Sequence, residues 1–213
     1  MKSRQHSNKG TEKGSVMLEF ALTALVLIPL FFGVVGVGLS LGNYIQVSQV
    51  TRDVAHIYAR GVDFSEVETQ DVAIRLTQGL GITRAGGNGV IILSRVITVT
   101  EADCEAANKK GNCPNQGETV FTQRLVLGNK ALRPSNHGTP ADGLLDGKGN
   151  IAAHNYLTNN TTVANGFKEQ LIAAGVTQER GDVAFMVETF VETPSLAFLG
   201  AAAPDGLYCR FVF

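Results

Sequence analysis

The chain has 213 residues, of which 44% are hydrophobic and 17% charged, and its net charge at pH 7 is −1. This length leaves room for one membrane-spanning helix and one modest globular domain, and it leaves none for two domains of ordinary size. With nearly equal numbers of basic and acidic residues, the chain provides no basic surface for a nucleic acid, so nucleic-acid binding is not expected.

Residues 1–14 are polar and show no hydrophobic periodicity, and we predict that they form a disordered leader. Four basic residues against one acidic residue give this leader a net charge of +3. Basic residues before an apolar segment keep the N-terminus in the cytoplasm, by the positive-inside rule. The part of the chain after the apolar segment is therefore predicted to lie outside the cytoplasm, behind a single pass of the inner (cytoplasmic) membrane.

An uncharged run of 32 residues begins directly after Glu19. Because about 20 apolar residues suffice to cross a bilayer, we predict a transmembrane helix over residues 15–42 and an exposed continuation of it over residues 43–61. Membrane spans usually exclude acids, since a carboxylate at mid-membrane costs roughly 2.5–3.5 kcal/mol. If the chain were cut after Gly14, the new α-amine of Ser15 would lie one helical turn from Glu19 and could pair with its carboxylate.

Pro29 lies inside the predicted span, where it removes one backbone hydrogen bond and favours a kink or local unwinding just before it. Such a proline can bend a helix within a filament, or it can simply be tolerated in a membrane helix. Glycines gather in the second half of the span, and small residues four apart let two helices approach closely. The alternative is that glycine is merely frequent in membrane helices. We predict a helix-packing surface that contains Pro29, Gly33, Gly38 and Gly42.

Beyond the span, apolar residues recur at three- and four-residue spacing from Tyr44 to Tyr58, which makes a stripe that a soluble domain can cover. Gly61 is expected to end the helix. Later segments alternate apolar and polar residues, or are rich in β-branched residues, and are therefore predicted to be strands. The predicted elements are a helix over 66–79, strands over 90–100 and 119–127, a short helix from Phe167 to Gly175, and strands over 183–191 and 207–213.

These elements predict an α+β fold, in which the exposed half of a long N-terminal helix packs on a small antiparallel sheet. The extracytoplasmic domain then covers residues 62–213. Within it, residues 129–165 read as a long solvated loop and a plausible contact surface, with a turn of helix at 153–157. Asp142, Asp146 and Asn150 resemble calcium ligands only superficially, because their spacing does not match an EF-hand loop.

Cys104 and Cys113 lie in a polar connection between two predicted strands, with eight residues between them. In an exported domain this spacing favours a disulfide, whereas a zinc site would need further ligands that the sequence does not place nearby. Cys209, in the last predicted strand, is expected to be a buried thiol, with pairing to another chain as the alternative.

The N-terminal pattern resembles a known processing signal. A short basic leader that ends in Gly14, then four residues, then Glu19 and Phe20 at the head of a long apolar helix, resembles the class III signal of type IV pilin-like proteins. It is most similar to that of the TadE-like minor pilins, or pseudopilins, of Tad/Flp pilus systems. The resemblance covers residues 1–60 closely and the remainder in outline, where residues 183–199 are similar to a late strand, acidic position, proline and apolar patch of that family.

This resemblance implies that a prepilin peptidase cuts after Gly14 and that Glu19 assists processing or assembly. It also implies a non-catalytic role in pilus assembly or adhesion. The implied partners are the prepilin peptidase, other pilins or pseudopilins, pilus assembly proteins and the membrane, with no cofactor and no metal. Two alternatives remain, an uncleaved anchor and removal of the whole helix. The second would need a shorter apolar core and a small-x-small cleavage site.

A second hypothesis is a signal-anchored extracytoplasmic binding module that is not incorporated into a pilus. An enzyme is disfavoured, because the sequence contains no His-Glu-x-x-His motif, no Walker loop and no Cys-x-x-Cys motif.

Overall fold

The structure is a computed structural model that describes residues 11–173, 175, 181–192 and 206–213. The chain divides into two compact units, and the second, globular unit begins at Tyr44.

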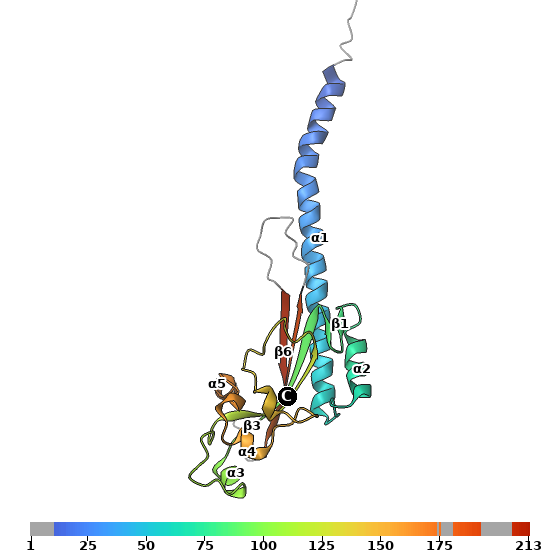
Figure 1. Cartoon of the computed structure of the whole chain (residues 1–213). Coiled ribbons are helices and arrows are strands. Elements are labelled where there is room, and N and C mark those ends of the chain that lie inside the picture. The colour runs from blue at the N-terminus through green and yellow to red at the C-terminus, as the bar shows by residue number, and fades with distance from the viewer. Residues whose placement is uncertain (1–10, 174, 176–180, 193–205) are drawn as a thin grey trace, which may run out of the picture. The chain divides into compact units, whose positions relative to one another are not determined.

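Helix α1 extends without interruption from Thr11 to Ala59 (Figure 1). It begins at Thr11, before the predicted start at residue 15, so the prediction of a disordered leader is wrong for residues 11–14, which are helical. The helix continues through Pro29 without local unwinding. The kink, which was the other possibility, stays a prediction. A proline removes one hydrogen bond, and the remaining bonds keep this helix intact. Gly61, with a φ of +83°, follows its end as predicted, since glycine adopts positive φ without strain.

A four-stranded antiparallel sheet forms the centre of the globular unit, in the order β4-β3-β5-β6. This arrangement confirms the predicted α+β fold, and the register pairs Leu93 with both Leu125 and Val187, and Val187 with Phe211. The strands are β3 (Gly89–Thr98), β4 (Thr119–Gly128), β5 (Val183–Glu192) and β6 (Gly206–Val212).

One face of the sheet packs on the C-terminal part of α1. Successive side chains of a strand point to opposite faces of the sheet. The side chains of Ile91, Leu93 and Val187 pack against those of Val47 and Val54 on the helix, and all five are 0% exposed. We call this cluster the helix-side core. Its buried members are Val47, Val50, Val54, Ala55, Tyr58, Phe64, Ala73, Leu80, Ile82, Ile91, Leu93, Leu127, Val187 and Val191.

The segment from Asn129 to Gly166 covers the opposite face of the sheet. Although this segment is mostly loop, it is less open than the sequence predicted, because Ile151 and Leu157 are buried and Ile151 N donates to Thr122 O at 2.9 Å. It contains three short helical turns, η1 (Asp142–Leu144), α4 (Ala153–Tyr156) and η2 (Asn160–Thr162), and α5 (Phe167–Ala173) follows it.

The remaining elements connect the core segments. Helix α2 (Val67–Leu76) matches the prediction for residues 66–79. A hairpin of β1 (Ile82–Thr83) and β2 (Gly86–Gly87) lies between the helix predicted over 66–79 and the strand predicted over 90–100, in a glycine-rich stretch for which no strand was predicted. A short helix, α3 (Glu101–Ala106), was also missed, and the side chains of Thr100 and Asp103 cap it reciprocally.

Candidate functional site

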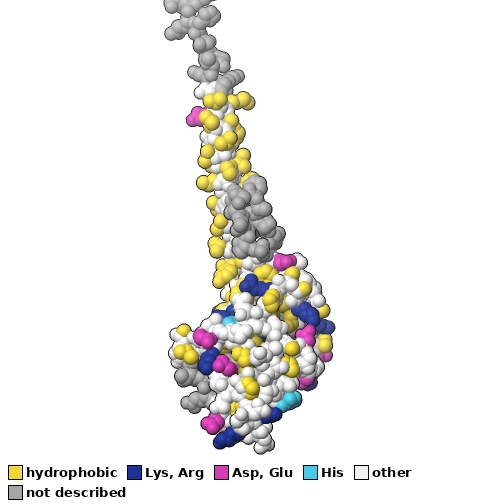
Figure 2. Space-filling view, turned by 60° about the vertical axis from the view of Figure 1, so that its left-hand side comes forward, with side chains coloured by type: hydrophobic (Ala, Val, Ile, Leu, Met, Phe, Trp, Pro, Cys, Tyr) yellow, Lys and Arg dark blue, Asp and Glu magenta, His cyan; other side chains and the backbone are white. Residues whose placement is uncertain are grey.

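The first half of α1 presents its hydrophobic side chains outward. Between Val16 and Leu41 its large apolar side chains are 41–78% exposed (Figure 2). Within the described part of the chain, this is the one helix long and apolar enough to cross a membrane, with a mean hydropathy of 2.5 over its most apolar window. Exposed apolar surface of this size marks an interaction with a membrane or a protein, so this half-helix is a candidate membrane anchor.

The residues of the predicted processing site lie together in one stretch of α1. Gly14, Ser15, Glu19 and Phe20 are all helical, and Phe20 is 75% exposed. Because Ser15 and Glu19 are four residues apart, their side chains share one face of the helix. The backbone carbonyl of Glu19 accepts a hydrogen bond from Thr23 Oγ1 at 2.8 Å. The Glu19 residue itself is exposed.

The predicted helix-packing residues also lie in this half of α1, and their surface is open. A Cβ atom added at Gly38 or Gly42 would meet no atom within 4 Å. Pro29 and Gly33 precede them on the same uninterrupted helix. The helix therefore offers backbone close to its surface at these two glycines, which is what close helix packing needs.

Residues 38–42 also have the form Gly-x-Ser-x-Gly, the pattern of a hydrolase nucleophile. That nucleophile requires a strained turn between a strand and a helix. Ser40 instead lies inside α1, and its hydroxyl donates to Gly36 O at 3.0 Å. The Gly-x-Ser-x-Gly pattern therefore belongs to a continuous helix with small residues, and Ser40 does not lie on the strained turn that a hydrolase nucleophile requires.

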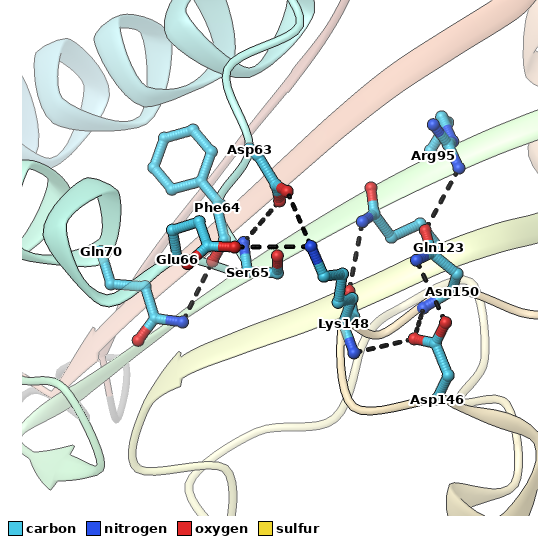
Figure 3. Close-up of polar contacts among 10 residues, drawn as sticks. All are labelled: Asp63, Phe64, Ser65, Glu66, Gln70, Arg95, Gln123, Asp146, Lys148 and Asn150. Atoms are coloured by element: carbon cyan, nitrogen blue, oxygen red, sulfur yellow. Dashed lines mark hydrogen bonds and ion pairs between the residues drawn. The ribbon is translucent and has the colours of Figure 1, made fainter.

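In the globular unit, one hydrogen bond joins the end of α1 to the sheet. Further polar contacts join the loop after α1 to the turn after η1, and that turn to β4 (Figure 3). Tyr58 on α1 donates its hydroxyl to Gln123 Oε1 at 2.9 Å, and Gln123 Nε2 on β4 donates to Lys148 O at 3.2 Å. The Lys148 ammonium lies 3.8 Å from Asp63 Oδ2 and 3.4 Å from Glu66 Oε1, in exposed ion pairs that contribute little energy. These contacts fix the loop over the edge of β4.

Alkaline pH is expected to destabilise the contact between Tyr58 and Gln123. Burial raises the pKa of Tyr58 well above its ordinary value of 10.0, so the folded state keeps the proton that the unfolded state loses. The contribution to stability is complete below pH 10 and is lost above it, by up to about 1.4 kcal/mol per pH unit. Denaturation of Tyr58→Phe should show a smaller slope of stability against pH above 10. Tyr44→Phe, which changes an exposed tyrosine of the same helix, should keep the slope, and equal slopes for all three proteins would contradict the assignment.

A buried polar cluster holds the loop segment to the other face of the sheet. Glu188 on β5 is 1% exposed, and its carboxylate accepts hydrogen bonds from Asn136 N at 3.1 Å, from Tyr208 Oη at 2.7 Å and from Ser135 Oγ. We call these residues the Glu188 cluster. Burial, and then the Glu188 charge, raise the pKa of Tyr208. Arg124 on β4 donates to Gly138 O at 2.9 Å, and burial lowers the pKa of its guanidinium to about 10.

This cluster was not predicted. In an alternating strand such as the one predicted over residues 183–191, polar side chains usually face solvent, whereas the loop segment covers that face and buries the Glu188 carboxylate. The one available signal was the acid itself, which lies between Val187 and Thr189 in the middle of a run of apolar and β-branched residues from Val183 to Val191.

Cys104, on α3, is joined to Cys113 by a disulfide, with the two Cα atoms 6.0 Å apart. Closing a connection of this length stabilises a fold by about 3 kcal/mol. Cys209 on β6 is a free, half-buried thiol that packs against the helix-side core.

The acidic side chains of residues 142–150 serve the loop itself. Asp146 Oδ1 accepts hydrogen bonds from the backbone N atoms of Lys148 and Asn150, both at 2.8 Å, and these bonds lower the pKa of the Asp146 carboxyl. Within the described ranges, no group of three or more His, Cys, Asp or Glu side chains is arranged to hold a metal ion.

Comparison with known proteins connects the helix to a family. Residues 14–56 match the model of the family described as TadE-like protein. No curated protein and no solved structure matches the chain significantly. The matched segment begins at Gly14, includes Glu19 and Phe20, and ends within the part of α1 that packs on the sheet. This helical segment is therefore similar to the TadE-like family.

Proposed function

We propose that the protein is a minor pilin or pseudopilin of a Tad-type pilus, and that its role is non-catalytic. A prepilin peptidase cleaves it after Gly14, and α1 then packs with other pilins or pseudopilins during pilus assembly or adhesion. The helix anchors the chain in the inner membrane in a single pass, with its N-terminus in the cytoplasm and the globular unit outside.

The observation that carries this proposal is the exposed apolar half of α1, which begins at the family match and contains a single acid. An isolated carboxylate in an apolar segment is costly unless it finds a partner. Cleavage after Gly14 supplies that partner, because the α-amine of Ser15 would lie one turn from Glu19 on the same helix face. The amine and the carboxylate can then set the register between neighbouring helices.

The test is the N-terminus of the membrane-extracted protein, determined by intact mass and N-terminal sequencing, with and without its prepilin peptidase. We expect the chain to begin at Ser15 only when the peptidase is present. Gly14→Ala should abolish this cleavage almost completely, whereas Gly10→Ala, the matched change elsewhere in the leader, should leave it intact.

A full-length chain under both conditions would reject the processed-pilin proposal. In that case the protein would act as a signal-anchored extracytoplasmic binding module outside the pilus. Glu19→Ala separates two further roles, since a loss of cleavage indicates a role in processing and a loss of pilus incorporation after normal cleavage indicates a role in assembly.

A further inference from the structure

The globular unit contains a pocket that neither the family match nor the proposed function uses. The pocket has a volume of about 650 Å³ and lies between β3, β4 and the loop segment 130–149. Ligand pockets usually measure about 300–1,000 Å³, with mainly apolar walls and a few convergent polar groups. Apolar side chains of this pocket include Ile92, Val126 and Leu145.

Three cationic side chains line the pocket, those of Arg124, Lys130 and Arg133. None of them forms an ion pair with a carboxylate of the described residues. Arg124 is 4% exposed, and its buried Nε–H has no hydrogen-bond partner there. The Glu188 charge favours the Arg124 cation, although the Glu188 carboxylate does not lie within ion-pair distance of it. A buried cation without a directly bonded anion is costly, so this wall of the pocket favours an anion.

The positions of the cations are set by the fold. The Arg124 guanidinium carbon lies 4.2 Å from the centre of the Phe121 ring, and that of Arg133 lies 4.7 Å from the centre of the Tyr208 ring. Arg133 also donates from Nη2 to Asn136 Oδ1 at 3.2 Å. Stacking holds a planar guanidinium in one orientation, which suits it to bind a carboxylate through two parallel hydrogen bonds.

Two carboxylates, of Asp142 and Asp146, also line the pocket, which leaves a surplus of one positive charge. The Asp146 carboxylate accepts hydrogen bonds from its own turn, and Figure 3 shows it directed at Asn150 and Lys148. A surplus of one charge matches a monoanion better than a phosphate group, which carries about −1.5 to −2 at pH 7.

We propose that this pocket binds small amphipathic carboxylates. The carboxylate lies beside Arg124, Lys130 and Arg133, and the apolar body lies against Ile92, Val126 and Leu145. The proposal does not rest on cleavage or pilus assembly, because every residue that it uses belongs to the globular unit.

Ligand-observed saturation-transfer NMR on the full chain in lipid nanodiscs tests the proposal, with phenylacetate as the probe. Phenylacetamide has the same shape without the charge, and inorganic phosphate is an anion without the apolar body. We expect phenylacetate to bind about tenfold more tightly than phenylacetamide, since charged hydrogen bonds are stronger than neutral ones. Phosphate should not compete at the same concentration.

Lys130→Gln and Arg133→Gln should each reduce the preference for phenylacetate over the amide at least threefold. Arg75→Gln, which removes an exposed cation of α2 outside the pocket, is the matched control and should leave the preference unchanged. Lys130 is exposed, so its replacement keeps the test valid even if Arg133→Gln impairs folding. Equal binding of acid and amide, a preference that both variants retain, or binding of phosphate alone would each overturn the proposal.

Discussion

Glu188→Ala is expected to destabilise the globular unit by about 3–5 kcal/mol. The change removes the acceptor of three hydrogen bonds, from Ser135, Asn136 and Tyr208. Unpaired buried donors cost about 1–3 kcal/mol each, although their costs do not add fully. It also removes a negative charge that favours the buried Arg124 cation. Urea denaturation of the full chain in detergent, followed by tyrosine fluorescence, measures the change.

Ser94→Ala is the matched control for this experiment. Ser94 lies on the same face of the sheet in β3, it is 0% exposed, and its hydroxyl has no partner among the described residues. Removing an unsatisfied buried hydroxyl should change stability by less than about 1 kcal/mol, or increase it. If Glu188→Ala cost no more than Ser94→Ala, the Glu188 cluster would not hold the loop segment to the sheet.

Val54→Asp is expected to cost at least about 4 kcal/mol and to leave the globular unit largely unfolded. Val54 is 0% exposed in the helix-side core, where a new carboxylate would be buried among hydrophobic side chains. Limited proteolysis of the membrane-bound chain should therefore degrade the globular unit rapidly.

Val72→Asp provides the comparison, because Val72 is 46% exposed on α2 and its carboxylate would remain in water. This variant should resist proteolysis like the unchanged protein, within about 0.5 kcal/mol of its stability. A protease-resistant Val54→Asp variant would show that the sheet does not depend on its packing against α1.

The fold could be predicted largely from periodicity. The strands β3, β4, β5 and β6 were all found, because each is long enough to show alternation or a β-branched run. Of the elements shorter than seven residues, the turn of helix predicted at 153–157 is confirmed as α4, whereas β1, β2, α3, η1 and η2 were missed. In the case of α3, the pair Thr100 and Asp103 forms a capping box that the sequence already contained. The β1–β2 hairpin depends on Gly81 and Gly87, both at positive φ, in a stretch whose many glycines fit a loop equally well.

The candidate sites differ in how far they can be predicted. The N-terminal site is local in the sequence, because Gly14, Ser15 and Glu19 belong to one helical stretch. The Glu188 cluster and the pocket are not local, since Ser135 and Glu188 are 53 residues apart and meet only after the loop segment has covered the sheet. A charged residue in an alternating strand is usually exposed to solvent. Glu188 is buried instead, because a segment distant in the sequence covers it.

The position of β6 determines when the sheet can be completed. Strand β6 pairs only with β5 in the described sheet. Its side chains Leu207, Cys209 and Phe211 nevertheless pack against the helix-side core, to which α1 contributes residues from near the start of the chain. Contacts between segments so far apart in the chain form slowly, because the entropy of a long loop must be lost before they contribute. A ribosome therefore releases the helix long before its covering strand exists. Until then the apolar stripe of α1 has no complete sheet to cover it, and that interval is when this protein most needs protection from aggregation.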